Sequence, residues 1–518
     1  MSRLQRAIHG VASGYVLLVA TAVYSLASVP LALHYLSKER FALWALMSAI
    51  GGYLGLIDLG MSGSVARLLI DHKDERDGGT YGSLIKTGWL VMLTQGTLIF
   101  LLGFALAPAL SGLLRIQPDL RMEFIQLLRW QSAALGMSFA LRIFSHLLQA
   151  HQRMDVCNYS GITSLGLSFV SLWCFFHVNQ GIFSLVWSAF LGSAGSAAVL
   201  WLSCRRLGIF PLGGAWGRVS WHHFQELFGY GKDLFLVAVG TQLIMASQTL
   251  IITRTLGLQA AALWSIGTKT FMLVSQLIWR ISDFAGPAFC EMMVRGEQTI
   301  LRERYRAVVI LTASLSGFVA VTFILCNSPF VAVWTHGKFT WPPLNDVLLG
   351  VWMIVMALLH CHNSFVLLTK RIAFMRYVYF IEGLVFVSVA LLVAKGGGLP
   401  AIIACSVVCS LLFSGAYGVW RISRYFGFPI RDVSFGWLAP MGRILAIFVP
   451  LAVVAWCGCR GIAQPLVRLS ILALFSGSFG SCILLRYGLP VGFQRELIQR
   501  APKCLDPYLR RLLGGAAP

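Results

Sequence analysis

Long apolar segments, separated by short polar connections, follow one another along the whole chain. Each segment is about 20 residues or more, the length of a helix that crosses a bilayer, whereas the strands of membrane barrels are about 10 residues and alternate apolar with polar. The first segment is too long for the apolar region of a signal peptide and is predicted to span. The pattern predicts about fourteen transmembrane helices, at residues 9–35, 41–69, 83–109, 123–150, 156–178, 180–203, 226–253, 259–290, 306–334, 344–369, 373–394, 398–420, 438–458 and 464–486.

The composition supports an all-α integral membrane protein. The chain is 57% hydrophobic and 12% charged, about half the charge content of a soluble domain. Its formal charge of +21 would suggest nucleic-acid binding in a soluble protein. Here the basic residues gather in short loops, which membrane topology and anionic lipids explain better. Nucleic acid is therefore not an expected partner.

The distribution of Lys and Arg predicts the orientation. Basic residues are concentrated in the N-terminus, in the connections 67–86, 204–225 and 295–306, and in the C-terminal tail, all on one side of the predicted membrane. Cytoplasmic loops carry such an excess. We therefore expect both termini in the cytoplasm and a location in the cytoplasmic membrane. The external connections are short.

Two features divide the chain into halves. The segment 205–225 is rich in Gly and Pro, as linkers are. The tripeptide Ala-Leu-Trp opens the second predicted helix at 42–44 and the eighth at 262–264. Because six spans separate the copies, the halves run in the same direction, an arrangement known from transporters. We predict two parallel six-helix lobes (1–204 and 226–421), a cytoplasmic linker (205–225), helices 13 and 14 (422–487) and a cytoplasmic tail (488–518) on the inner membrane surface.

The eighth predicted helix carries charges within the bilayer. Lys269, Gln276, Arg280 and Asp283 follow one another at steps of seven, four and three, so at about 100° per residue they share one helix face. A charge at a helix centre costs roughly 2.5–3.5 kcal/mol on insertion scales, which makes such residues functional candidates. The stripe either lines a hydrated cationic cavity or packs against other polar helices. Arg280 and Asp283 are also spaced to pair with each other.

Other predicted helices add further candidates. Arg142 lies too deep in the fourth helix to reach the interface easily, and Lys232 opens the seventh near the inner surface. Asp58, on a glycine-rich helix, and Glu382, in the eleventh, either bind a coupling proton or cation or pair with basic residues. The basic residues outnumber the acids, so the predicted cavity favours an anion. Arg142, Lys269, Arg280, Lys232 and Gln276 are the predicted substrate-binding residues, and Asp58, Glu382 and Asp283 are candidates for ion coupling or pairing.

Motifs of enzymes and metal sites are not evident in the sequence. It has no GxxxxGK[ST] phosphate loop, and no HExxH or GxSxG element in a suitable context. The Cys residues lie mostly inside apolar runs without zinc spacing, and His360 and His362 are interpreted as interfacial. We therefore expect no enzymatic activity, no cofactor and no metal. An anionic amphiphile suits a basic cavity in a chain without soluble domains.

Two stretches of sequence, together with the fourteen-span plan, carry a family resemblance. YLGLIDLGMSGSVAR at 53–67 and SWHHFQELFGYGKDLF at 220–235 resemble the polysaccharide transporter (Wzx-type flippase) branch of the multidrug/oligosaccharidyl-lipid/polysaccharide exporter superfamily. The resemblance implies two six-helix lobes in a V that open alternately to each face. It also implies a central cationic cavity for the pyrophosphate and sugars of an undecaprenyl-linked oligosaccharide, with helices 13 and 14 forming a groove for the lipid.

The function expected from this resemblance is transport of lipid-linked glycan for O-antigen, capsule or exopolysaccharide synthesis. Expected partners are this substrate, membrane lipids and possible glycan polymerase or export machinery. Two alternatives within the superfamily stay open: a lipid II flippase for peptidoglycan, and a cation-coupled multidrug antiporter, which would need an acidic cavity. A membrane enzyme of glycan assembly or a scaffold without transport activity agrees less well with midplane charges and short external loops.

Overall fold

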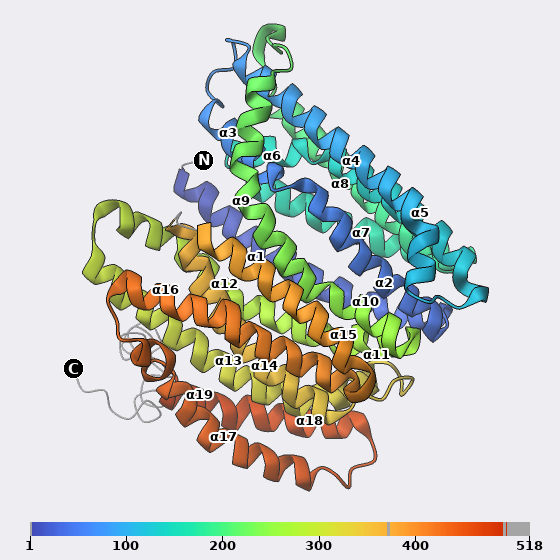
Figure 1. Ribbon diagram of the computed structural model, residues 1–518, viewed down its shortest axis with the longest axis vertical. Helices are drawn as coiled ribbons and strands as arrows, with labels where there is room; N and C mark the ends of the chain where they lie inside the picture. The colour runs from blue at the N-terminus through green and yellow to red at the C-terminus, as the bar shows by residue number, and fades with distance from the viewer. Residues whose placement is uncertain (1–2, 370–372, 490–493, 495–518) are drawn as a thin grey trace. The chain divides into compact units, whose positions relative to one another are not determined.

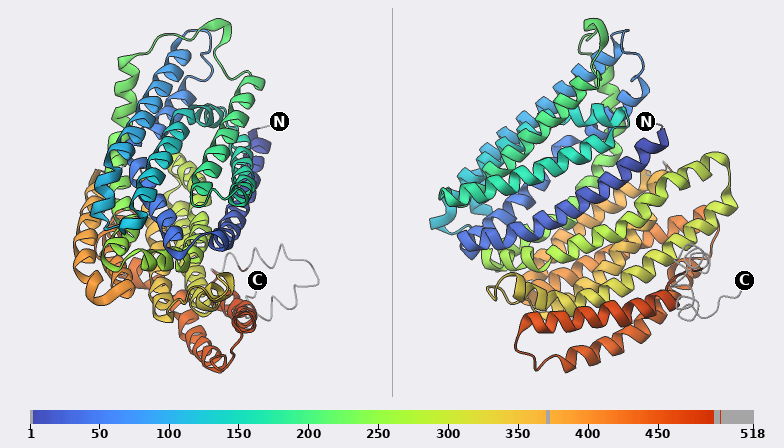
Figure 2. Two further views of the ribbon diagram at one scale, coloured as in Figure 1. Left: turned by 90° about the vertical axis from the view of Figure 1, so that its right-hand side faces the viewer. Right: turned by 180° about the vertical axis from the view of Figure 1, so that it is seen from behind.

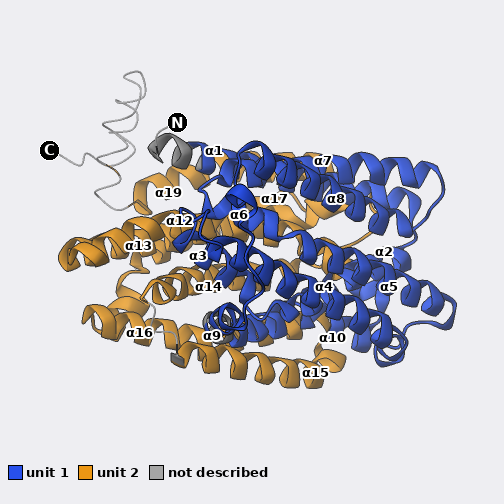
Figure 3. Ribbon diagram, turned by 90° about the horizontal axis from the view of Figure 1, so that it is seen from above, with its two compact units in different colours: residues 1–262 blue, residues 263–518 orange. Residues whose placement is uncertain are grey.

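A computed structural model of the protein describes residues 3–369, 373–489 and 494. Within these residues every regular element is helical and no strand occurs (Figures 1 and 2). The contacts divide the chain into two compact units, unit 1 (Met1–Ala262) and unit 2 (Leu263–Pro518), which Figure 3 colours separately. The boundaries of the predicted lobes rest on the internal sequence repeat, whereas the units are defined by contacts. The division into units therefore does not test the lobe boundaries, which stay a prediction. Most of the predicted tail, 490–493 and 495–518, lies outside the described residues.

Unit 1 contains the first seven predicted spans, several of them interrupted. Its helices are α1 (Arg3–Tyr35), α2 (Lys38–Leu54), η1 (Gly55–Asp58), α3 (Met61–Asp71), α4 (Thr80–Leu113), α5 (Pro118–Leu141), α6 (Ile143–Ala150), α7 (Met154–His177), α8 (Phe183–Arg206), η2 (Leu212–Gly214), α9 (Trp221–Met245) and α10 (Ser247–Leu256). The next helix, α11 (Leu258–Gly267), crosses the boundary between the units.

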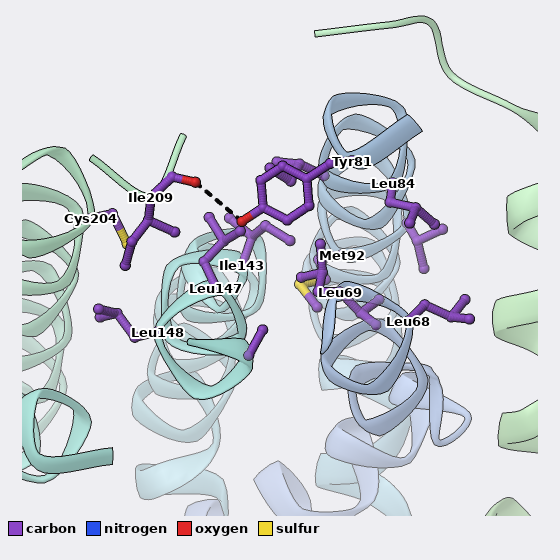
Figure 4. Close-up of a cluster of buried hydrophobic side chains, with 14 of the residues drawn as sticks. Leu68, Leu69, Tyr81, Leu84, Met92, Ile143, Leu147, Leu148, Cys204 and Ile209 are labelled. Carbon is purple, nitrogen blue, oxygen red and sulfur yellow. Dashed lines mark hydrogen bonds between the residues drawn. The ribbon is translucent and has the colours of Figure 1, made fainter. Parts of the chain in front are cut away.

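Close helix approach builds the interior of unit 1. A Cβ atom on Gly96 of α4 would overlap the carbonyl oxygen of Gly136 of α5, and the reverse holds for Gly136. Small residues let backbones approach in this way in membrane bundles. At one end of the unit, Tyr81 is fully buried in an apolar cluster with Leu147 and Ile209 (Figure 4). Its hydroxyl donates to the Ile209 carbonyl at 3.2 Å and so fixes the segment that follows α8.

The segment 207–220, part of the predicted linker, runs along the start of α4. The Ser83 hydroxyl donates to the Arg218 carbonyl at 2.5 Å, and Lys86 Nζ donates to the Gly217 carbonyl at 3.1 Å. The backbone N–H of Ser220 donates to Thr87 Oγ1 at 3.1 Å. These bonds hold the segment against unit 1.

Unit 2 is built around one long central helix. Its helices are α12 (Lys269–Arg295), α13 (Gln298–Trp334), α14 (Pro343–Leu368), α15 (Ala373–Ser410), the π-helical η3 (Leu411–Gly415), α16 (Ala416–Phe426), the π-helical η4 (Asp432–Gly436), α17 (Ala439–Gly458), α18 (Pro465–Phe475), the π-helical η5 (Ser476–Gly480) and α19 (Ser481–Tyr487). The central helix α13 contacts α12, α14, α17, α18 and α19. Predicted helices 13 and 14 therefore pack on α13.

Among the described residues, eleven helical segments are long and apolar enough to cross a membrane. The segment Phe374–Phe426 contains two predicted spans, separated by Gly398, whose φ of 61° breaks the helix. The two predicted spans missing from this set are α5–α6 and α11–α12, which contain Arg142, Lys269, Arg280 and Asp283. With these adjustments the predicted fourteen-helix plan is confirmed, and the protein is a multi-pass membrane protein.

Candidate functional site

Two predicted substrate-binding cations lie at helix interruptions. Arg142 is the residue between α5 and α6, and its backbone N–H bonds to Phe139, three residues back, at 3.1 Å. Lys269 is the first residue of α12 and follows Thr268, whose hydroxyl donates to the Trp264 carbonyl at 2.7 Å. A short backbone turn or a threonine bonded to its own helix produces such breaks. Interrupted helices are typical of the binding regions of membrane transporters.

Arg142 opens onto a polar pocket inside unit 1. The pocket has a volume of about 420 Å³ and lies between α1, α5–α6, α7 and α8. Its polar lining consists of hydroxyls and the guanidinium, supplied by Thr21, Ser138, Arg142, Ser145, Ser160, Ser164, Ser193 and Ser196. The guanidinium carbon lies 3.7 Å from the centre of the Phe139 ring. Among the described residues Arg142 forms no ion pair.

Asp58 lies at the break in the second predicted helix. Leu59 and Gly60 adopt left-handed conformations there, with φ of 50° and 73°. Asp58 Oδ1 accepts from the backbone N–H of Ser62 at 3.3 Å and from the Ser62 hydroxyl, so the carboxylate caps the first turn of α3. Asp58 also interacts electrostatically with Arg142, although the two form no direct ion pair.

The break at Asp58 is tied to neighbouring helices by contacts that sequence reasoning missed. Gln95 Nε2 donates to the Asp58 carbonyl at 2.9 Å. Gln242 Nε2 donates to the Gly52 carbonyl at 3.0 Å, and the Tyr53 and Ser247 hydroxyls bond to each other. The depth of Gln242 was evident in the sequence, but its partner was not. These bonds hold the region around the break of α2 to α4, α9 and α10.

In unit 2 the predicted polar stripe is one face of α12. Gln276, Arg280 and Asp283 are exposed, and Lys269 is partly buried. Arg280 Nη1 lies 3.7 Å from Asp283 Oδ2, the predicted local pair. Lys269 forms no ion pair with any residue that the structure describes. Because exposed charges are costly against lipid, this face needs polar surroundings, and the two predicted alternatives, a hydrated cavity and packing against other polar helices, both stay open.

His360 of α14 joins this face, a partner that the sequence did not indicate. Its Nε2 lies 2.9 Å from Asp283 Oδ1, and its ring stacks on Trp279 at 4.9 Å between centroids. His362 is instead buried, and its Nδ1 bonds the Tyr305 hydroxyl at 2.7 Å. The two histidines thus have separate surroundings, one polar and one in the aromatic core of unit 2.

Glu382 is fully buried on α15. Its Oε2 accepts from the backbone N–H of Ser414 in the π-helical η3 at 3.1 Å, and its Oε1 has no hydrogen-bond partner among the described residues. No Lys or Arg that the structure describes forms an ion pair with it. Of the two roles predicted for Glu382, this geometry agrees better with binding a proton or cation than with ion pairing.

The remaining predicted substrate residue cannot be placed by its contacts. Lys232 belongs to α9, but the side chains of residues 230–234 lie outside those described. The start of the same helix brings together the described residues His222, His223 and Glu226, whose ligand atoms lie within 4.8 Å of one another. They form a surface group of metal-ligand type that sequence reasoning did not select, although their spacing was visible.

One titratable group outside the spans has a strongly altered pKa. Burial lowers the pKa of His151 to about 4, and the neighbouring charges of Arg76 and Lys73 contribute to the shift. His151 Nε2 lies 3.1 Å from the Tyr81 hydroxyl, and Arg76 Nη1 donates to the Gly208 carbonyl at 2.5 Å. The neutral imidazole is therefore part of the set of contacts that holds the segment after α8.

Comparison with known proteins identifies the family. A model of the polysaccharide biosynthesis protein family matches residues 18–340, which is more than half of the chain. The chain belongs to the polysaccharide biosynthesis protein family. No curated protein matches this family member in sequence.

Solved structures show how widely the fold of this polysaccharide biosynthesis protein is shared. The lipid II flippase MurJ in an inward closed conformation has a TM-score of 0.67 and 13% identity, over 95% of this chain and 100% of that one. An inward-facing multidrug resistance MATE family transporter of the MOP superfamily has a TM-score of 0.58 and 13% identity, over 79% and 95%. At such identities the likeness establishes the fold, which is that of MOP superfamily transporters.

Proposed function

We propose that this protein translocates a polyprenyl-pyrophosphate-linked oligosaccharide across the cytoplasmic membrane by alternating access, for the synthesis of a surface polysaccharide. The observation that carries the proposal is membership of the polysaccharide biosynthesis family by a chain that has the fold of a lipid flippase over almost its whole length. The proposed cargo is anionic and amphiphilic, and the undecaprenyl chain is its expected lipid.

The exposed face of α12 supports an anionic cargo. Lys269 and Arg280 are two cations on one face, with Gln276 between them. Guanidinium forks bind phosphate oxygens in pairs, and an ammonium acts as a point charge. We propose that these residues, with Arg142 and Lys232, bind the pyrophosphate and sugars. Asp283, Asp58 and Glu382 remain candidates for coupling or pairing, and Glu382 is the strongest of them because it is buried without an ion-pair partner.

The orientation, the lobes and the partners are part of the same proposal. Both termini lie in the cytoplasm, the parallel lobes 1–204 and 226–421 move against each other, and a glycan polymerase or exporter receives the cargo. A reporter active only in the cytoplasm, fused after Tyr487, should give a signal. A signal from the external side would contradict this orientation.

Deletion of the gene tests the transport function. We expect loss of one surface polymer and accumulation of its undecaprenyl-linked repeat unit at the cytoplasmic face. Intact glycans with altered sensitivity to cationic drugs would favour the multidrug antiporter. Accumulation of lipid II with arrested wall synthesis would favour the peptidoglycan flippase. The excess of basic residues favours the first outcome over the antiporter.

A further inference from the structure

The pocket of unit 1 differs in chemistry from the exposed face of α12. Its polar lining consists of serine and threonine hydroxyls, with Arg142 as the one charged residue among the lining residues described. At about 420 Å³ it falls within the usual range of small-ligand sites, roughly 300–1,000 Å³. Polar groups are costly to remove from water unless they form hydrogen bonds. The polar part of the lining therefore suits a ligand that carries hydroxyls, while Leu17, Leu141 and Leu200 are among its apolar residues.

Some of the hydroxyls already have partners and others are free to bind a ligand. The Ser160 hydroxyl bonds to Ser196 Oγ at 2.6 Å, which joins α7 to α8. Among the described residues, nothing bonds to the hydroxyls of Ser138, Ser164 or Ser193. A serine that served only for close packing would not need a cavity in front of it. The three unbonded hydroxyls come from α5, α7 and α8, so they approach a ligand from different sides.

The cation in the pocket limits the charge of the ligand. One guanidinium, held against the Phe139 ring and without an ion pair among the described residues, matches one carboxylate through two parallel hydrogen bonds. Asp58 interacts electrostatically with Arg142 but forms no direct ion pair with it, and its Oδ1 accepts hydrogen bonds from Ser62. A pyrophosphate carries more negative charge and finds two cations on α12 of unit 2. The pocket therefore matches a single carboxylate surrounded by hydroxyls.

We propose that the pocket of Arg142 and the serines of α5, α7 and α8 binds a carboxylate-bearing sugar of the cargo, so that the transported glycan contains an acidic sugar. Arg142 binds the carboxylate, and Ser138, Ser164 and Ser193 bind ring hydroxyls. This inference rests on the proposed function and names the class of sugar that the function requires. The pyrophosphate is bound elsewhere.

Protection of an introduced thiol tests the pocket directly. In the purified full-length protein, Leu165→Cys places a thiol in the lining without removing a proposed ligand-binding hydroxyl, and its reaction with a maleimide is followed by mass spectrometry of its peptide. We expect D-glucuronate to slow this reaction at least threefold, and glucose or pyrophosphate to leave it unchanged. Adding Arg142→Gln should abolish the protection, and adding Arg142→Lys should weaken it.

Two matched controls accompany this test. Thr163→Cys places a thiol on the exposed side of α7, where glucuronate should give no protection. Arg129→Gln removes a guanidinium from α5 that lies 4.2 Å from the Phe104 ring, outside the pocket, and should preserve protection at position 165. Absence of protection by glucuronate, protection that survives Arg142→Gln, or equal protection by pyrophosphate would each overturn the assignment.

The glycan itself gives an independent test. The polymer lost on deletion of the gene should contain a carboxylate-bearing sugar in its repeat unit. A lost polymer that is entirely neutral would overturn this inference while leaving the proposed transport function intact. Unchanged surface glycans after deletion would instead contradict the proposed function.

Discussion

The polar side chains of units 1 and 2 have different surroundings. In unit 1 the groups of greatest interest meet inside the bundle, where helix breaks bring Arg142 near Asp58 and beside a serine-lined pocket. In unit 2 the cations Lys269 and Arg280 lie on one face of α12, and Asp346 is locked in a buried hydrogen-bond network. Polar residues in one protein can thus line a pocket, present charge at an exposed face or stabilise the fold through buried hydrogen bonds. Their neighbours, more than their type, separate these roles.

The Asp346 network shows the structural role most clearly. Asp346 Oδ1 accepts from Asn327 Nδ2 and from Trp341 Nε1, both at 2.7 Å, and its Oδ2 accepts from the Ser328 hydroxyl. Asn327 also donates to the Gly267 carbonyl at 3.0 Å. A carboxylate with this many donors is well satisfied in a buried site. In unit 1, Arg142 has no comparable set of partners among the described residues.

The largest effect is expected on the exposed face of α12. Lys269→Ala or Arg280→Ala should reduce export to the level of the deletion strain, because the proposed pyrophosphate site loses half its charge. Arg280→Ala should not alter the thermal midpoint by more than about 2 °C, since exposed charges contribute little to stability. Surface polymer and the membrane content of the protein are measured together. Normal export in both variants would remove this face from the site.

The second prediction concerns packing in unit 1. Gly136→Val should destabilise the protein, toward the upper end of the about 1–3 kcal/mol typical of overpacking. The new side chain meets the backbone carbonyl of Gly96, which cannot rotate away. Thermal unfolding in detergent measures the effect. Gly166→Val, where a Cβ has open space, is the control. Equal stability of the two variants would show that the close contact of α4 and α5 is unimportant.

The third prediction concerns the buried network of unit 2. Asn327→Ala removes one of the three side-chain donors to Asp346 and should cost about 1–3 kcal/mol, as expected for a buried polar group left short of a partner. The thermal midpoint should fall, and the exposed Ser470→Ala control should leave it unchanged. Wild-type stability of Asn327→Ala would mean that the network is not structural, and the contrast with unit 1 would disappear.

The fold was largely predictable because the bilayer imposes a minimum length on each apolar run. All fourteen predicted spans have a helical counterpart among the described residues, although the sequence did not indicate where α5 ends at Arg142 or that Asp58 caps α3. Helical periodicity also placed Lys269, Gln276 and Arg280 on one face. Periodicity within one helix cannot predict a contact with a residue of another helix, such as the contact of His360 with Asp283.

The pocket in unit 1 was missed for the same reason. Serines at 160, 164 and 168 recur along α7 at helical spacing, and this was the available signal. In a membrane helix the same spacing is also typical of close packing. The two roles are distinguished by whether a neighbouring helix fills the space in front of the hydroxyls: Ser168 is buried and bonded to the Ser188 carbonyl, whereas Ser164 lines the pocket.

The smallest effect is expected at His151, outside the spans of unit 1. Its pKa in the folded protein, about 4, lies below its ordinary value of 6.5, so the folded state favours the neutral ring. This contribution to stability is fully present above pH 6.5 and is lost as the pH falls from 6.5 toward 4. Protonation would place a cation beside Arg76 and weaken the contacts of the segment 207–220.

Hydrogen exchange measures this effect locally, after correction for intrinsic rates. Between pH 7 and pH 5, exchange of residues 207–220 should increase modestly, and exchange of α13 in unit 2 should not change. His151→Gln keeps a polar side chain but cannot become charged, so it should remove most of the pH dependence. If residues 207–220 respond to pH equally in His151→Gln and the wild type, a group other than His151 controls the segment.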